Sequence, residues 1–290
     1  MRFFQRFGVV PRKSVALIVA VLSPLSLSAC QTTDIANSIG GATQLASTLD
    51  TSAERQRQLA LQGEQQILKE KPVSRDKALE SYLNKMANDM ARASSINDYQ
   101  YNVRLIEDAA VNAFTTGAGR LFVTTGLVKA LDNEAQMAAV LSHEMAHVTE
   151  SHVVRGMRDK TAILVGAQAG AAALGANQNL LAQAAYKYAV SAAVNGHGRG
   201  FETDADVVGL KYLVAAGYDA REAPKVFEKF IKLYGDQSKT VNFFHGGHPR
   251  NVERIATLKK ELSSTYRGKN FANARRNTRT YANLTARYKP

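Results

Sequence analysis

The chain contains the sequence His143-Glu144-Met145-Ala146-His147, in which an acidic residue follows the first of two histidines. On a helix, positions 143 and 147 are one turn apart, so both imidazoles face the same way and can share a tetrahedral metal ion. Glu144 then lies beside the metal, where its carboxylate can take a proton from an attacking water. This pattern is typical of zinc-dependent hydrolysis.

A catalytic zinc site of this kind needs a third protein ligand besides two histidines. The metzincin pattern requires glycine at 150 and histidine at 153, but this chain has Glu150 and Val153, which excludes that branch. The other common arrangement uses a glutamate on a later helix, with a carboxylate one turn further on. Glu202 and Asp206 have this spacing. We therefore expect Glu202 to bind the metal and Asp206 to accept a hydrogen bond from a ligand histidine.

Three further histidines are not expected to bind the metal. His152 comes five residues after His147, which on a continuous helix turns it well away from the metal face. We interpret His152 as a surface or capping residue. His197 and His245 lie in glycine-rich stretches, and we do not expect either of them to be a ligand.

The N-terminal residues have the pattern of an export signal. The first 29 residues carry a charge of +4 and no acidic group, and Ser14 to Leu27 is mostly apolar. The sequence Leu27-Ser28-Ala29-Cys30 resembles the lipobox of bacterial lipoproteins, which implies cleavage before Cys30 and lipidation there. Gln31 follows rather than aspartate, which implies the outer membrane of a Gram-negative bacterium, facing the periplasm.

The net charge of +12 belongs mainly to the two ends of the chain. The last 27 residues carry +7 and no acidic group, whereas residues 30–263 carry only +1. With export expected, this excludes nucleic acid as the natural partner; the basic end instead favours anionic lipid or an acidic partner. The expected organisation is a signal peptide (1–29), a flexible tether (30–52), a peptidase domain (53–263) and a basic tail (264–290).

The hydrophobic pattern predicts an α+β fold in which a small sheet precedes a run of helices. A hairpin with its turn at 117–119 joins the second and third strands. The alanine-rich stretch 161–194 is open to interpretation as a lid, a membrane-facing hairpin or closely packed core helices. The predicted strands are 101–107, 110–115 and 120–124, and the predicted helices are 53–70, 76–94, 126–131, 133–149 (capped by Asp132), 202–216, 219–234 and 250–262.

From about Asp76 to Leu262 the chain resembles the HtpX-like and CAAX-prenyl-endopeptidase family of zinc metallopeptidases, a gluzincin family. When the lipobox is also considered, the chain most closely resembles the periplasmic lipoprotein branch of this family. The resemblance rests on Val111-Asn112-Ala113-Phe114, Thr125-Gly126-Leu127, Asp132-Asn133-Glu134, His143 to His147, Arg199 three residues before Glu202, Ala205-Asp206, and His248-Pro249 followed by Arg254-Ile255.

The resemblance implies one Zn²⁺ per chain in a mostly helical zincin-type domain, with a small sheet edge beside the active-site helix. It also places His248 near the active site, where it could stabilise the oxyanion or occupy the open zinc position at rest. Simple helix capping before Pro249 is the alternative for His248. Arg199 could instead supply positive charge, or pair with Asp206.

The resemblance further places Asn112, Ala113 and Phe114 along an exposed sheet edge, to which an extended peptide could add. For Asn112, a turn residue at a strand end is the alternative. The implied activity is that of an endopeptidase that cleaves unfolded or misassembled envelope proteins. A periplasmic chaperone or assembly scaffold on the same fold, with little proteolysis, remains an alternative, and the outer-membrane assembly machinery is a candidate partner.

Overall fold

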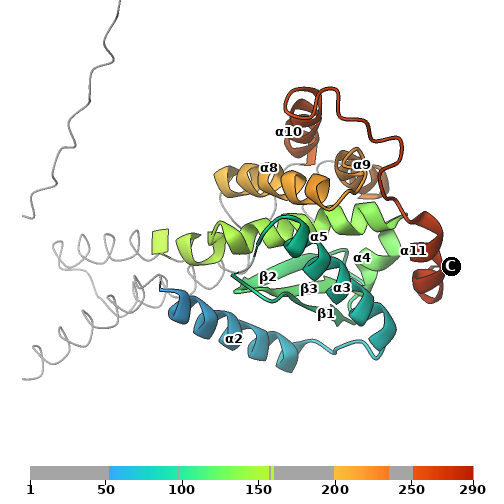
Figure 1. Cartoon of the computed structure of the whole chain (residues 1–290). Coiled ribbons are helices and arrows are strands. Elements are labelled where there is room, and N and C mark those ends of the chain that lie inside the picture. The colour runs from blue at the N-terminus through green and yellow to red at the C-terminus, as the bar shows by residue number, and fades with distance from the viewer. Residues whose placement is uncertain (1–51, 97, 157, 160–198, 235–250, 290) are drawn as a thin grey trace, which may run out of the picture. The chain divides into compact units, whose positions relative to one another are not determined.

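The computed structural model describes residues 52–96, 98–156, 158–159, 199–234 and 251–289 (Figure 1). All of them belong to one unit of the chain, Gln44–Pro290. The expected signal peptide, Cys30 and nearly all of the tether lie outside the described residues, as do the stretch 161–194 and His248. What the sequence predicts for these parts stays a prediction.

Three short strands form one mixed sheet in the order β1-β3-β2. β1 (Asn102–Ile106) runs parallel to β3 (Arg120–Thr124), and β2 (Ala113–Gly117) runs antiparallel to β3. The turn between β2 and β3 has positive φ at Gly117 and Gly119, a conformation that glycine adopts without steric cost. The predicted hairpin is confirmed, although β2 begins three residues later than expected.

Helices cover both faces of the sheet. α2 (Ala53–Glu70) lies below it in Figure 1, where Glu64 forms ion pairs with Arg104 on β1 (3.5 Å) and Arg120 on β3 (2.7 Å). α3 (Lys77–Ala93) and α5 (Glu134–Thr149) pack on the other side, against the apolar side chains that alternate with these arginines. The short α4 (Thr125–Ala130) connects β3 to the start of α5.

The outer edge of β1 is closed by polar side chains of α3. Asn84 donates to the carbonyl of Val103 (2.8 Å) and accepts from its N–H (2.9 Å), and Asn88 does the same for Tyr101 (2.8 and 3.0 Å). Glu80 accepts from the next outward-facing N–H at 3.2 Å. Because the three side chains are spaced four residues apart, they line one face of α3 and replace a neighbouring strand. This edge therefore cannot pair with another chain.

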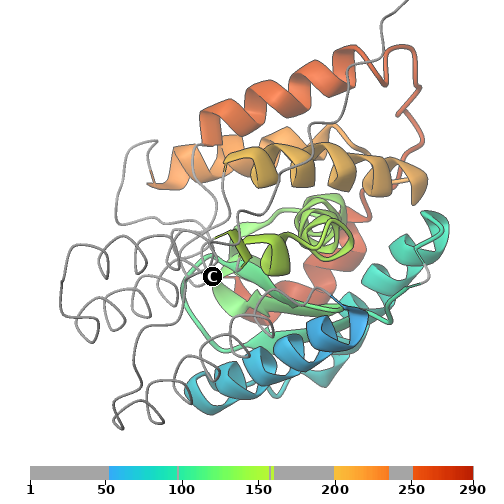
Figure 2. The same cartoon turned by 90° about the vertical axis from the view of Figure 1, so that its left-hand side faces the viewer.

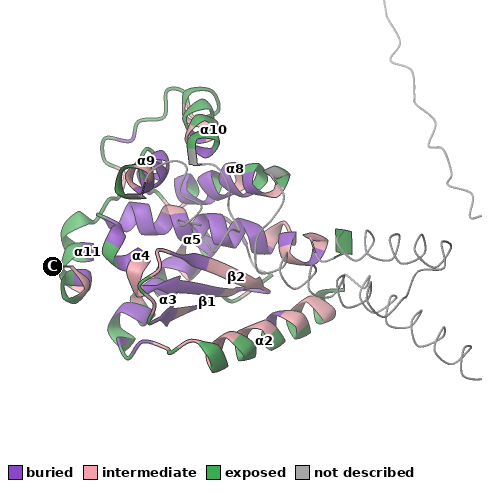
Figure 3. Cartoon of the chain, turned by 180° about the vertical axis from the view of Figure 1, so that it is seen from behind, coloured by how far each residue is buried: buried purple, intermediate pink, exposed green. Residues whose placement is uncertain are grey.

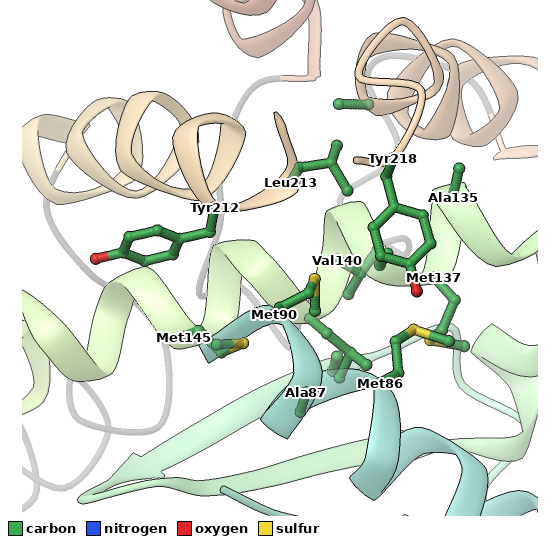
Figure 4. Close-up of a cluster of buried hydrophobic side chains, with 14 of the residues drawn as sticks. Met86, Ala87, Met90, Ala135, Met137, Val140, Met145, Tyr212, Leu213 and Tyr218 are labelled. Atoms are coloured by element: carbon green, nitrogen blue, oxygen red, sulfur yellow. The ribbon is translucent and has the colours of Figure 1, made fainter. Parts of the chain in front are cut away.

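α5 is the central helix of the described domain and is buried along almost its whole length (Figure 3). Met137 and Met145 of α5 meet Met86 and Met90 of α3 in the apolar core (Figure 4). A helix buried on all sides has no solvated face on which to place polar groups. Its polar side chains must therefore find partners inside the protein.

The start of α5 differs from the sequence prediction by one residue. The sequence predicts Asp132 as the cap, but the Asn133 side chain accepts the hydrogen bond from Gln136 N–H at 3.0 Å. The Asn133 amide also donates to Glu222 of α9 at 3.0 Å, which ties the start of α5 to α9. Asp132 lies further out and forms an ion pair with Lys229.

α8 (Arg199–Ala215), α9 (Glu222–Tyr234) and α10 (Asn251–Ser263) form a layer on the far side of α5 from the sheet (Figure 2). These bounds confirm the predicted helices to within three residues. α8 ends just before Gly217, which has a φ of 76° and stops the helix as predicted. None of the helices in the described ranges has the length and apolar character needed to cross a membrane.

The C-terminal segment, 264–289, which the sequence analysis describes as a basic tail, packs against the body. It contains α11 (Thr278–Thr285) and a 3-10 turn, η1 (Ala286–Tyr288). Arg275 lies 3.0 Å from Glu134 of α5, Arg276 lies 2.6 Å from Asp219, and Tyr281 is fully buried. Part of the basic charge of this segment thus pairs with acidic groups of the body.

Candidate metal centre

Two histidines of α5 and a glutamate of α8 bring three possible ligand atoms together. His143 Nε2 lies 3.0 Å from His147 Nε2, and the Glu202 carboxylate oxygens lie 3.5 Å and 3.4 Å from these two nitrogens. A tetrahedron with metal–nitrogen bonds of 2.0–2.1 Å has edges of about 3.3 Å. The triangle therefore has the size and donor set of a zinc site with one open position.

The close crossing of α8 over α5 places Glu202 beside the histidines. A Cβ atom at Gly209 would lie only 3.0 Å from the backbone of His143, so this approach requires glycine. Glu202 lies about two turns before Gly209 on α8 and Asp206 about one turn before it, and both are almost fully buried. His143 and His147 are four residues apart on α5, as are Glu202 and Asp206 on α8. These four side chains form one cluster only because the two helix axes come this close.

His143 is oriented by a carboxylate that is itself held by an arginine. Asp206 Oδ1 lies 3.1 Å from His143 Nδ1, so a His143 that offers Nε2 to a metal can donate its Nδ1 proton to Asp206. Arg254 of α10 donates to both oxygens of Asp206, with Nη2 at 2.6 Å and Nε at 3.0 Å. Its Nη1 also lies 3.4 Å from Glu202 Oε2. One guanidinium therefore contacts both Glu202 and Asp206.

The charge balance of the buried cluster also fits a divalent cation. Burial alone raises the pKa of Asp206 and lowers the pKa of Arg254, but their mutual attraction reverses both shifts, so both groups are charged. The buried cluster holds three carboxyl groups, those of Asp206, Glu202 and Glu144, and the one guanidinium of Arg254. A divalent cation would offset the excess of carboxyl groups, which a buried site requires.

Protons compete with the metal for the same nitrogen atoms. Burial and Arg254 lower the pKa of His143, while hydrogen bonds to Asp206 and Glu202 raise it, and the net result is a raised pKa. Because a ligand histidine must be neutral, metal binding at this site has to displace protons.

Arg254 is the functional residue that the sequence analysis overlooked. The sequence indicates Arg254 only as part of the family pattern, and it offers Arg199 as the possible partner of Asp206. The guanidinium that pairs with Asp206 belongs to Arg254, which is 4% exposed and lies 4.2 Å from the ring of Phe227. The side chain of Arg199 lies outside the described part of the chain. Two buried acids one turn apart were the signal that a buried cation was needed.

The interpretation of His152 as a surface residue was wrong. It is fully buried, and its Nδ1 lies 2.9 Å from Nδ1 of His147. α5 ends at Thr149, Ser151 has a left-handed φ of 53°, and His152 begins a new helical stretch. The prediction assumed one continuous helix, whereas this kink turns the imidazole back toward the metal face.

The predicted substrate-binding residues lie at the β2 edge of the sheet, which packs beside α5. Asn112 is 2% exposed, and its backbone carbonyl accepts from Thr124 N–H at 3.0 Å. Ala113 is buried toward the core, while Phe114 turns to the opposite face and stacks on Phe122 at 4.8 Å. The structure thus brings the edge strand next to the helix that carries both histidines.

The chain belongs to peptidase family M48, whose family model matches residues 77–262, more than half of the chain. The matched range contains α5, α8 and Arg254 of α10, which are the elements that build the candidate metal centre. Family membership makes the chain a metallopeptidase by class.

Several curated proteins are similar to the chain. A mitochondrial metalloendopeptidase OMA1 from Arabidopsis thaliana is 28% identical over 218 residues, which cover 70% of this chain and 41% of the relative. A putative beta-barrel assembly-enhancing protease from Vibrio cholerae is 27% identical, covering 67% and 41%. The beta-barrel assembly-enhancing protease of Escherichia coli is 28% identical, covering 55% and 34%. The chain therefore spans about two fifths or less of the length of these relatives.

Replacing Arg254 with methionine should strongly destabilise the metal-free protein. Asp206 and Glu202 would keep their buried negative charges without a counter-charge, which costs about 3–5 kcal/mol of the free energy of unfolding. The double variant Arg254→Met/Asp206→Leu should recover part of that loss, because the buried charge leaves with its partner. Denaturant unfolding of the EDTA-treated protein measures both effects.

Lys260→Met is the matched control, since Lys260 is exposed on the same helix. We expect it to change the free energy of unfolding by less than about 0.5 kcal/mol. Wild-type stability in Arg254→Met would contradict the assigned role of the guanidinium.

Proposed function

We propose that the chain is a zinc-dependent endopeptidase. The observation that carries this proposal is the triangle of ligand atoms from His143, His147 and Glu202, on the same helix pair as Glu144 and beside an edge strand. Zinc, when bound, would act as a Lewis acid that polarises the scissile carbonyl and makes the attacking water more acidic. The donor set favours zinc among divalent metals, since two imidazoles and one carboxylate are common zinc ligands.

In this proposal the chain's own residues divide the remaining work. Glu144, which is 1% exposed, takes the proton of the attacking water and passes it to the leaving amine. Asp206 and Arg254 keep His143 and Glu202 in the geometry described above. His248 is the proposed donor to the oxyanion, with Arg199 as the alternative source of positive charge.

The edge of β2 is the proposed site for the substrate backbone. Because Thr124 N–H bonds to the carbonyl of Asn112, alternation along an antiparallel ladder directs the backbone groups of Ala113 and Thr115 away from β3. An extended peptide could pair with these groups. Among the described residues the opposite edge is already occupied by the side chains of Asn84 and Asn88, which favours β2 as the pairing edge.

We propose that the substrates are unfolded or misassembled proteins of the bacterial envelope. Pairing with a sheet edge reads the backbone and needs an extended segment, which folded proteins rarely expose. The lipobox at Cys30 supports anchoring at the outer membrane on the periplasmic side. Similarity to proteases named for assembly of beta-barrels supports the same compartment and a role in protein quality control.

Further contacts with anionic lipid or with outer-membrane assembly machinery would use the exposed part of the C-terminal segment. Arg267, Lys269 and Arg279 are exposed there, whereas Arg275 and Arg276 form ion pairs within the domain. A chaperone or scaffold with little proteolysis remains the second candidate, and the Glu144 experiment below separates the two.

Glu144→Gln should abolish proteolysis while leaving zinc bound. Loss of the general base should lower kcat for a labelled unfolded polypeptide by about 10²–10⁴-fold. The zinc content should stay at one ion per chain, because the three ligands are unchanged. Glu150→Gln, the same chemical change at the C-terminal cap of α5, is the control and should keep wild-type activity. Equal degradation by wild type and Glu144→Gln would favour the scaffold instead.

Peptides that carry one N-methyl group should show an alternating loss of cleavage. N-methylation removes one backbone hydrogen bond, so it should lower kcat/KM about 3–10-fold at the positions that face β2 and little at their neighbours. The measurement uses a parent peptide methylated singly at two adjacent residues on the N-terminal side of the scissile bond. Equal sensitivity at both positions would exclude strand pairing.

Cys30→Ser should prevent lipidation and keep the protein from reaching the outer membrane. Radiolabelled palmitate and membrane fractionation of a Gram-negative host expressing the full chain would measure both. The wild-type chain should be labelled and fractionate with the outer membrane, whereas the variant should remain as an unlabelled precursor. Normal outer-membrane fractionation of Cys30→Ser would refute the lipoprotein proposal.

A further inference from the structure

The two nitrogens of His147 face different environments. Nε2 faces the metal side, 3.0 Å from His143 Nε2 and 3.4 Å from Glu202 Oε1. Nδ1 faces His152, whose Nδ1 lies 2.9 Å away. A distance of 2.9 Å between two ring nitrogens is that of a hydrogen bond, so one of them carries the proton and the other accepts it.

The chemistry of a metal ligand decides which nitrogen carries that proton. For Nε2 of His147 to offer a lone pair to zinc, its proton must sit on Nδ1, and His147 is then the donor. Nδ1 of His152 must accept, which places the proton of neutral His152 on Nε2. That nitrogen lies 3.9 Å from Oδ2 of Asp204, a distance that suits a water-bridged or electrostatic contact.

His152 is held in place by its packing against α8. It is fully buried, and its ring stacks on Phe201 with centroids 4.5 Å apart. Phe201 and Asp204 both come from α8, the helix that also carries Glu202. The same helix therefore supplies one metal ligand and the packing behind another.

We propose that His152 is a positioning residue, which holds His147 in the tautomer and orientation that bind zinc, and that Asp204 in turn orients His152. The two ligand histidines then have different supports. His143 donates to a charged carboxylate that Arg254 fixes, whereas His147 donates to a neutral imidazole. This inference rests on the proposed zinc site, and it adds a residue that the HExxH pattern does not contain.

The test is zinc affinity of the full chain, measured by chelator competition on the metal-depleted protein. His152→Phe keeps a ring against Phe201 but removes the acceptor, and it should weaken zinc binding about 10–100-fold. His152→Asn restores an acceptor oxygen near the position of Nδ1 and should lie within about threefold of wild type. Asp204→Asn should lie between them. The Co²⁺-substituted protein should show a changed visible absorption spectrum in His152→Phe and a wild-type spectrum in His152→Asn.

The outcomes separate this inference from the proposed function. If wild type fails to bind zinc, the proposed function fails. If wild type binds zinc and His152→Phe binds it equally well, His152 has no positioning role. If His152→Asn is as weak as His152→Phe, the loss comes from packing and not from the acceptor. Near wild-type zinc affinity in His152→Asn, together with weakened zinc affinity in His152→Phe, supports the assignment of His152 as a positioning residue.

Discussion

Burial of polar groups on α5 is the constraint that organises the rest of the domain. The helix is enclosed by the sheet, α3 and α8, yet it carries Glu134, His143, Glu144 and His147, each 5% exposed or less. An unpaired buried charge costs several kcal/mol, so each of these groups needs a partner from another element. Those partners come from six separate parts of the chain: α3, α8, the connection between α8 and α9 that holds Tyr218, α10, the helical stretch that starts at His152 and the C-terminal segment. The elements that cover α5 are therefore selected by charge and hydrogen bonding as well as by shape.

Glu134 shows why the C-terminal segment is part of the domain. Its carboxylate accepts hydrogen bonds from Tyr82, from Tyr218 at 2.6 Å, from Arg275 at 3.0 Å and from Asn277 at 2.8 Å. Two of these four donors lie more than 140 residues later in the chain. Read alone, a segment with seven basic and no acidic residues suggests a solvated tail. Its acidic partners are distant in sequence, and no local pattern connects them, so the packing could be found only in three dimensions.

The same distinction separates the predictable part of the site from the rest. His143 with His147, and Glu202 with Asp206, are pairs within one helical turn, and their shared direction follows from helix geometry alone. The hairpin follows from glycines between two β-prone runs. Arg254 was not predicted because Asp206 and His143, which its guanidinium contacts, lie about 50 and 110 residues earlier in the chain. The error for His152 has another cause, since a single left-handed residue reversed the direction that a continuous helix would give.

The crossing of α8 over α5 brings the histidines of α5 and the acids of α8 together at the candidate metal centre. Glu202, Asp204 and Asp206 alternate along one stretch of α8, and they face the candidate metal position, His152 and His143, respectively. Gly209 allows the approach, and Arg254 then joins α10 to Glu202 and Asp206. The cluster is therefore complete only when α5, α8 and α10 are docked together. A cation that binds only when the three helices are docked stabilises the docked arrangement by mass action. Docking of the α8–α10 layer on α5 and binding of a metal ion would therefore be coupled, so that each favours the other.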